Sequence, residues 1–332
     1  MDHFSVALII LVTAALIFDF LNGFHDAANT IATIVVTRTL TPIAAVIMAG
    51  AANFIGYFSF SHAVAKTIGK GVIHLDAVTL PLLLAALTGA IIWNIITWLL
   101  GLPTSSSHAL IGGLIGAGVA AAGWSVVVVD GFIKIVAFIF IAPLLGMVGA
   151  AIFTWLIILL FRKTHPKKAD KSFRALQLLS SLMGSIGHGT NDAQKTMGII
   201  AMAMVAAKVH PDFRLDNWVV LSCYSAIALG TMFGGWRIVR TMGTQITKIR
   251  PMEGFSSGAA AALVLLGTSQ VGIPVSTTHV IAGSIMGVGA VENAGQVRWI
   301  TARKIVWAWF LTIPATAIFA SISYHLISMI AK

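Results

Sequence analysis

The chain has 332 residues, of which 58% are hydrophobic and only 10% charged, and its mean hydropathy is +0.94. A soluble domain carries charged residues at nearer a quarter of its length, so this composition excludes an ordinary soluble protein. The formal net charge of +10 does not indicate a nucleic-acid partner, because basic residues collect in the cytoplasmic loops of membrane proteins. Cys223 is the one cysteine of the sequence, which excludes an internal disulfide.

Four apolar runs are about long enough to cross a bilayer as helices, which takes ~20 residues. In chain order they cover 4–18, 80–100, 135–161 and 306–322. The N-terminus lacks a basic region and a small-residue cleavage site, so the first run is interpreted as a membrane helix rather than a removed signal. We therefore expect an all-α, multi-pass protein of the cell membrane, surrounded by the lipid bilayer.

Two motifs occur twice, in the same order. Residues 23–34, GFHDAANTIATI, match residues 189–200, GTNDAQKTMGII, and residues 102–118 match residues 273–289. Two matches at nearly one offset indicate an internal repeat. The predicted units are a first transmembrane repeat over 1–161, a basic cytoplasmic linker over 162–174 and a second transmembrane repeat over 175–332.

The basic residues predict how the two halves are oriented. The linker carries six Lys and Arg, and placing it in the cytoplasm puts most other basic residues on the same side. Each half then makes an odd number of net crossings, so the second half is inverted relative to the first. Two inverted repeats with broken helices and re-entrant helical hairpins are typical of secondary transporters, which bind their substrate near the midplane.

Asp26 and Asp192 occupy matching positions of the first motif, inside apolar sequence. An ionisable side chain within a span costs at least ~2.5–3.5 kcal/mol, so each aspartate indicates a functional site. Such a site would bind either a cation that balances the charge of a transported anion or a cation that is transported alone. Each follows a glycine by three residues, which favours an unwound helix beside a cavity. Asp19, two turns before Asp26, is a candidate for the coupling cation or an interfacial residue. The alternative is that each aspartate only caps a helix half.

Other polar groups lie on the same turns as the two aspartates. They are Asn29, Asn191, Gln194 and Lys195.

The second motif, PTSSSH in the first half and PVSTTH in the second, brings hydroxyls into apolar sequence. Proline ends one helix, and Ser or Thr caps the next, whose N-terminal N–H groups and positive dipole end suit an oxyanion. Ordinary capping is the alternative. The candidate anion-binding hydroxyls are Ser105, Ser106, Ser107, Ser276, Thr277 and Thr278.

Four histidines adjoin these motifs. His108 and His279, which the repeat pairs, either pack in the first turn of a helix or take part in transport. His25 and His188 neighbour the aspartates and are candidates to bear protons or contact a metal. A serine three residues from a histidine on one helix is not a catalytic triad, so we expect no enzyme and no resident metal or cofactor.

These motifs together, GFHDAAN (23–29), GHGTNDAQKTMGI (187–199), PTSSSH and PVSTTH, resemble the inorganic phosphate transporter family, the low-affinity phosphate symporters of bacteria. The resemblance implies cation-coupled phosphate import by an inverted-repeat fold, in a homodimer. It also implies that Asp26, Asn29, Asn191 and Asp192 surround phosphate and cation, with the six hydroxyls at hairpin tips.

Departures from the family pattern bear on the coupling ion. Animal members carry glutamates where Gly56 and Gly258 align here, and His25 stands where many members have asparagine. We therefore expect coupling to H⁺ rather than Na⁺, with transport of phosphate as a neutral metal complex as a further option. Membrane potential alone requires some coupling, because a dianion entering against 100 mV costs about 4.6 kcal/mol.

Two rival functions stay open at this point. A sulfate permease of the same family would carry another tetrahedral anion, but sulfate cannot donate a hydrogen bond to Asp26 and Asp192 at neutral pH. A divalent-metal transporter, with His25 and His188 as further ligands, would leave the six hydroxyls without a task.

Overall fold

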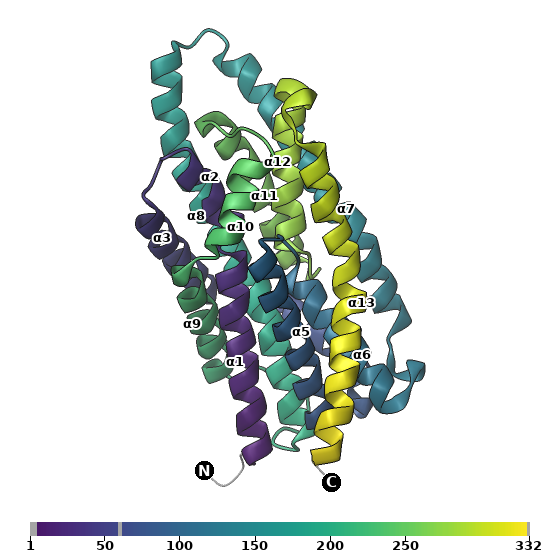
Figure 1. The fold of residues 1–332 in the computed structure, drawn as a ribbon. Coiled ribbons are helices and arrows are strands. Elements are labelled where there is room, and N and C mark those ends of the chain that lie inside the picture. Colours follow the sequence, from purple (N-terminus) through teal and green to yellow (C-terminus); the bar gives the residue numbers. More distant parts are fainter. Residues whose placement is uncertain (1–4, 59–61, 331–332) are drawn as a thin grey trace.

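The computed structural model describes residues 5–58 and 62–330, except for the side chains of residues 292 and 293. The described chain is helical throughout its regular structure (Figure 1). The helices are α1 (Val6–Asp26), α2 (Ala28–Val36), α3 (Pro42–Ile55), α4 (Ala63–Gly71), α5 (Leu80–Leu100), α6 (Ser106–Ala122), α7 (Val129–Phe161), α8 (Pro166–Ala206), α9 (Asn217–Phe233), α10 (Trp236–Arg240), α11 (Pro251–Gln270), α12 (Thr277–Asn293) and α13 (Trp299–Ile330).

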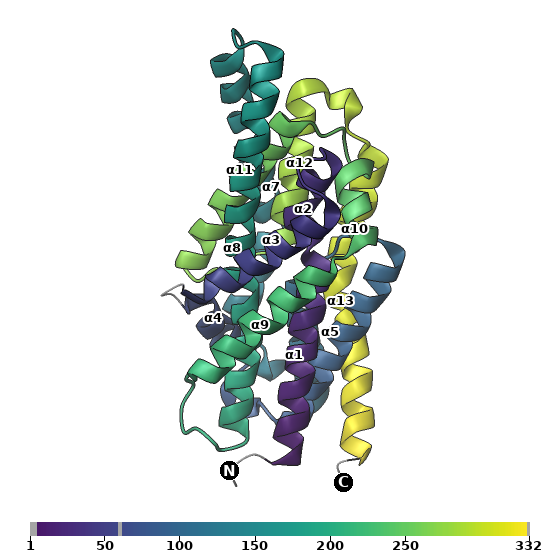
Figure 2. The ribbon, with the colours of Figure 1, turned by 90° about the vertical axis from the view of Figure 1, so that its left-hand side faces the viewer.

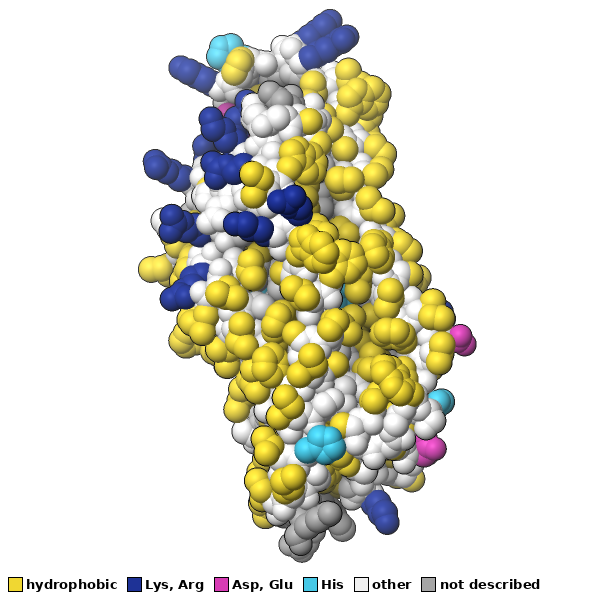
Figure 3. All heavy atoms as spheres, turned by 45° about the vertical axis from the view of Figure 1, so that its right-hand side comes forward, with side chains coloured by type: hydrophobic (Ala, Val, Ile, Leu, Met, Phe, Trp, Pro, Cys, Tyr) yellow, Lys and Arg dark blue, Asp and Glu magenta, His cyan; other side chains and the backbone are white. Residues whose placement is uncertain are grey.

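The four predicted apolar runs lie in helices that can cross a membrane. The segments long and apolar enough are Val6–Val36, Leu80–Leu100, Val129–Phe161 and Trp299–Ile330. Large apolar side chains on their outer surfaces are exposed and form a broad hydrophobic band, which suits contact with lipid (Figure 3). The all-α, multi-pass fold is therefore confirmed.

Basic side chains gather at one end of the molecule. Lys and Arg gather on the upper part of the face shown in Figure 3, toward the end where α7 connects to α8, while the two termini lie at the opposite end (Figures 1 and 2). This asymmetry agrees with a cytoplasmic linker. Only residues 162–165 of the predicted linker lie outside helices, because α8 already begins at Pro166.

Two helical hairpins carry the repeated hydroxyl motifs at their tips. In both hairpins a glycine with positive φ lies just after the first helix. Gly101 has φ +65° and Gly272 has φ +72°, and the two positions are 171 residues apart. The hairpin α5–α6 extends from the end that carries the termini and α11–α12 from the end that carries the linker, so their tips approach from opposite directions (Figure 1). This arrangement is compatible with the predicted inverted repeat.

The halves are interleaved through small residues. Helix α6 packs on α13 and helix α12 on α7, so each hairpin lies against the long last helix of the other half. At Gly283 a Cβ would lie 2.2 Å from the carbonyl oxygen of Pro143, and at Gly112 it would lie 2.6 Å from that of Ile313. Such close contact between backbones requires glycine.

Helix breaks occur, but not all of them where the sequence analysis expects. Helices α9 and α10 are bent by 61° at Gly234, whose φ is +70°. At the first aspartate motif, Ala27 separates α1 from α2 but keeps right-handed helical angles. At the second motif α8 is continuous, so the break predicted beside Asp192 is wrong.

The glycines of these motifs serve close packing instead of unwinding. A Cβ at Gly23 would lie 2.1 Å from the carbonyl oxygen of Ile227, and one at Gly189 would lie 2.4 Å from that of Asn53. Each glycine thus lets a neighbouring helix approach the aspartate-bearing turn.

Candidate functional site

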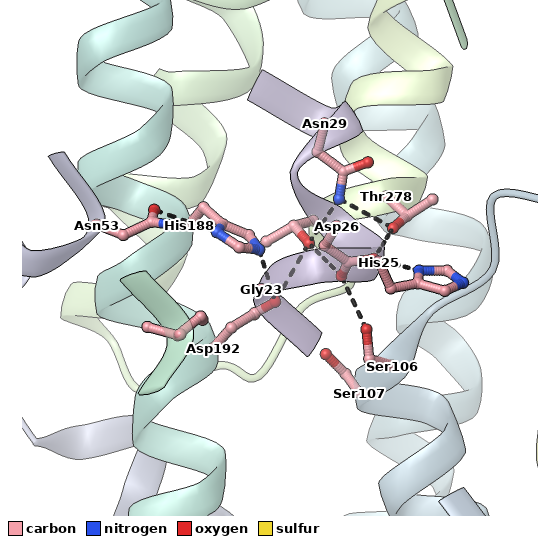
Figure 4. A network of polar contacts seen from close by, with 12 residues as sticks. Gly23, His25, Asp26, Asn29, Asn53, Ser106, Ser107, His188, Asp192 and Thr278 are labelled. Carbon is pink, nitrogen blue, oxygen red and sulfur yellow. Dashed lines mark hydrogen bonds and ion pairs between the residues drawn. The ribbon is translucent and has the colours of Figure 1, made fainter. Parts of the chain in front are cut away.

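The repeated motifs meet inside the protein, far from both ends. The junction of α1 and α2 supplies Asp26, α8 supplies Asp192, and the hairpin tips bring hydroxyls from α6 and α12 (Figure 4). Both aspartates are buried, with 2% and 0% exposure. The predicted convergence of segments that lie far apart in the chain is therefore observed.

The carboxylate of Asp26 is contacted by hydroxyl groups from both hairpin tips. Ser106 donates to Asp26 Oδ2 at 2.9 Å, and Thr277 and Thr278 lie 3.5 and 3.4 Å from its two oxygens. On the other side His25 Nδ1 lies 2.7 Å from Asp26 Oδ1. The first-half aspartate is thus contacted by side chains from both halves.

Asp192 has a different set of partners. Lys195 donates to Asp192 Oδ1 at 2.5 Å, one helical turn away, and His188 Nε2 lies 3.3 Å from Asp192 Oδ2. Thr277 lies 3.4 Å from the same oxygen and 3.5 Å from Asp26. One hydroxyl has one proton, so Thr277 can donate to only one of the two carboxylates at a time.

One imidazole and the two carboxylates form a compact cluster. A ligand atom of Asp26, one of His188 and one of Asp192 all lie within 4.8 Å of one another. Carboxylate oxygen and imidazole nitrogen are ligands for many divalent metals. The arrangement could therefore hold a proton or a cation between the two halves.

Asn29 links the first aspartate motif to the second-half tip. Its Nδ2 donates to Thr277 Oγ1 at 3.2 Å and to Thr278 Oγ1 at 3.0 Å, while its Oδ1 has no partner. Both hydroxyls can in turn donate to an anion. A small cavity beside Asn29 is lined by further hydroxyls from α2, α8 and α11, among them Thr33, Ser181 and Ser257.

The capping interpretation holds for one hydroxyl of each tip. Ser105 Oγ accepts a hydrogen bond from His108 N–H at 3.1 Å, and Ser276 Oγ accepts one from His279 N–H at 3.2 Å. These two serines start α6 and α12. The next two hydroxyls of each tip are the ones that reach Asp26, Asp192, Asn29 or Lys195, through Ser106, Ser107, Thr277 and Thr278.

Three of the predicted polar residues differ in their surroundings. Asn191 is buried and both polar atoms of its side chain lack partners, whereas Asp19 is buried beside Thr196 and Cys223. Gln194 instead caps a neighbouring helix, since its Oε1 accepts from the N–H groups of Val64 and Ala65. Gln194 therefore supports α4.

The two tip histidines contact one another. The ring centroids of His108 and His279 lie 4.7 Å apart, and His279 stacks on Trp309 with centroids 4.0 Å apart. Trp309 Nε1 donates to the carbonyl of Pro103, which fixes this stack against the first-half tip. The histidines thus pack the hairpins together, as one of the two interpretations expects.

Three further polar residues support the site and lie outside the repeated motifs. Asn53 Oδ1 lies 3.2 Å from His188 Nδ1, and Asn53 Nδ2 donates to Thr231 at 2.7 Å. Thr97 Oγ1 lies 3.2 Å from His25 Nε2. The sequence analysis missed them, and the available signal was a lone asparagine or threonine within an apolar run.

Comparison with known proteins shows the family of the chain. The phosphate transporter family (PHO4) matches residues 22–320. A "Probable low-affinity inorganic phosphate transporter" of Rhizobium meliloti is 49% identical, with 97% of this chain and 96% of the relative aligned. A protein of the same description from Bacillus subtilis is 43% identical over 99% of this chain and 100% of the relative.

A solved structure extends the likeness to the whole fold. "The sodium-dependent phosphate transporter" superposes with a TM-score of 0.91 and 26% identity, over 98% of this chain and 100% of that one. With its membrane-spanning helices the chain is thus a multi-pass transporter of the cell membrane rather than an enzyme. It belongs to the phosphate transporter family.

Proposed function

We propose that this protein imports inorganic phosphate and couples its entry to H⁺. The observation that carries the proposal is the meeting of Asp26 and Asp192 with hydroxyls from both tips, in which Thr277 lies within 3.5 Å of each carboxylate. Hydroxyl and amide groups give an anion uncharged donors, and carboxylates hold the cations that balance it. The names of the relatives and of the solved structure support phosphate as the substrate.

The carboxylates also favour phosphate over sulfate. Phosphate at neutral pH still carries a proton that can be donated to a carboxylate, whereas sulfate has none. A site that pairs Asp26 and Asp192 with a dianion needs such a proton or a cation between the charges.

Charge balance sets a minimum for the coupling. Each charge that crosses 100 mV is worth about 2.3 kcal/mol, so a dianion needs at least two accompanying positive charges for neutral entry. Asp26 and Asp192 are the proposed positions, with Asp19 as a third carboxylate nearby.

The cluster of Asp26, His188 and Asp192 supports a specific second candidate. A divalent cation held there would enter together with phosphate as a neutral complex, or alone if the protein were a metal transporter. In this proposal the metal is cargo. Entry of the metal as a phosphate complex should require phosphate, whereas entry of the metal alone should not.

The cavity beside Asn29 suggests a release route. Its hydroxyls lie on α8 and α11 between the site and the end that carries the linker. Polar groups at this depth suit a path for an anion that has left the tips.

We also propose that the protein forms a homodimer, which crosslinking in native membranes would test.

Reconstitution into proteoliposomes tests the function. We expect uptake of labelled phosphate that an inward pH gradient accelerates and that excess sulfate leaves largely unchanged. Divalent metal uptake without phosphate would favour the metal transporter, and equal competition by sulfate would favour a sulfate permease.

Asp26→Asn and Asp192→Asn test the site itself. Each variant keeps the shape of the side chain and removes its charge, so we expect phosphate uptake to fall at least tenfold. Wild-type uptake in both would overturn the proposed site.

A further inference from the structure

Lys195 is buried to 1% exposure, and it is the only Lys or Arg classed as buried among residues 5–58 and 62–330. An ammonium carries three N–H donors. Three oxygens receive them: Asp192 Oδ1 at 2.5 Å, the carbonyl of Val275 at 3.1 Å, and the hydroxyl of Ser107. The charge is therefore fully hydrogen-bonded inside the membrane domain.

The three oxygens come from three separate parts of the fold. Asp192 belongs to α8, Ser107 to the first turn of α6, and Val275 to the non-helical tip before α12. A carboxylate, a hydroxyl and a free backbone carbonyl are the oxygen types that bind hard cations. Unwound carbonyls near broken helices are also what secondary transporters use for Na⁺.

A second carboxylate lies close to this oxygen shell. Asp19 is fully buried, and its electrostatic neighbours include Asp192 and Lys195. Without the ammonium, two carboxylates would lie near one another in a poorly solvated interior. Such an uncompensated charge is strongly unfavourable, so loss of the lysine would favour binding of a free cation or a proton in its place.

We propose that the Lys195 ammonium is a resident cation that occupies a latent sodium site, so that phosphate transport by this protein needs no Na⁺. The proposal rests on phosphate transport as the function and names what determines its coupling ion. The ammonium ties α8 to both hairpin tips, the task that a bound ion would otherwise perform. Removal of the lysine side chain should therefore make the protein sodium-responsive.

Uptake by proteoliposomes tests this at one fixed pH, with NaCl or choline chloride outside. Wild-type protein should take up labelled phosphate equally in both salts. Lys195→Ala should become at least fivefold faster in NaCl, with saturation as Na⁺ rises. Lys195→Arg keeps a charge at this position and should stay independent of Na⁺. Equal uptake by Lys195→Ala in both salts, at a measurable rate, would overturn the proposal.

A binding readout covers the case in which Lys195→Ala does not transport. The melting temperature of the purified variant in detergent should rise with NaCl relative to choline chloride, and that of wild type should not. Lys195→Ala/Asp192→Asn lacks the carboxylate ligand and should lose the rise. If Lys195→Ala shows no sodium-dependent melting shift and no sodium-dependent uptake, the latent site does not exist.

Failure of the proposed function and failure of the latent sodium site give different results. Absence of phosphate uptake by the wild-type protein would contradict the proposed function, whereas the melting shift of Lys195→Ala would still report on the sodium site. A wild-type protein whose phosphate uptake requires Na⁺ would contradict the resident cation alone.

Discussion

Asn29 on α2 donates a hydrogen bond to Thr278 on α12 across a separation of 249 residues, with Nδ2 and Oγ1 3.0 Å apart. The contact joins the aspartate motif of one half to the hydroxyl tip of the other. Because Thr278 also lies 3.4 Å from Asp26, its hydroxyl can donate a hydrogen bond either to this carboxylate or to a bound anion.

Replacement of Thr278 by valine should weaken phosphate binding. The side chain keeps its shape but loses the hydroxyl, and a hydrogen bond to a charged group contributes about 1.5–3 kcal/mol. We expect the KM for phosphate uptake to rise roughly tenfold or more. Thr88→Val is the matched control, since Thr88 bonds only to the carbonyl of Leu84 within α5. An equal rise in KM in both variants would count against a substrate contact.

Asp19→Asn should uncouple uptake from the proton gradient. Asp19 is buried and lies near Asp192 and Lys195, so a proton on its carboxyl group would change the charge balance of the site. We expect the acceleration by an inward pH gradient to disappear, while uptake without a gradient persists. Asp76→Asn, at an exposed position, should behave as wild type. Full gradient-driven acceleration in Asp19→Asn would remove this residue from the coupling.

Gln194→Ala should lower the thermal stability of the protein without changing its KM for phosphate. Its side-chain oxygen accepts hydrogen bonds from the first N–H groups of α4, at 3.0 Å from Val64 N and 3.3 Å from Ala65 N. Leaving buried donors unpaired costs about 1–3 kcal/mol each, so thermal unfolding in detergent should begin at lower temperature. We expect the KM for phosphate to stay unchanged in the folded protein. A large rise in KM with unchanged melting would restore Gln194 to the substrate site.

The case of Gln194 illustrates what the repeat could and could not predict. The pairing of Asp26 with Asp192 and of Ser106 with Thr277 predicted that these residues lie together, because buried charge and paired hydroxyls are costly unless they meet. The offset that pairs Asp26 with Asp192 also pairs Gln194 with Ala28, and this pairing gives no sign that Gln194 caps a helix. That role depends on where α4 lies, and packing between distant helices decides it.

The helix break expected at Asp192 is absent for a related reason. Gly189 precedes the aspartate as a site of unwinding would, but its missing side chain is needed for the approach of Asn53 from α3. A glycine in a sequence permits both outcomes. Asn53, Thr97 and Thr231 were likewise beyond prediction, since each is a single polar residue whose partner comes from another helix.

Gly283→Ala should destabilise the interleaved halves without touching the site. The new methyl would lie 2.2 Å from the carbonyl oxygen of Pro143, so α12 and α7 must separate. Overpacking of this kind costs about 1–3 kcal/mol, and the melting temperature in detergent should fall. Gly267→Ala is the matched control, because nothing lies within 4 Å of its added Cβ and alanine favours the helix. If Gly283→Ala melts no lower than Gly267→Ala, then the close contact between α12 and α7 does not contribute to stability.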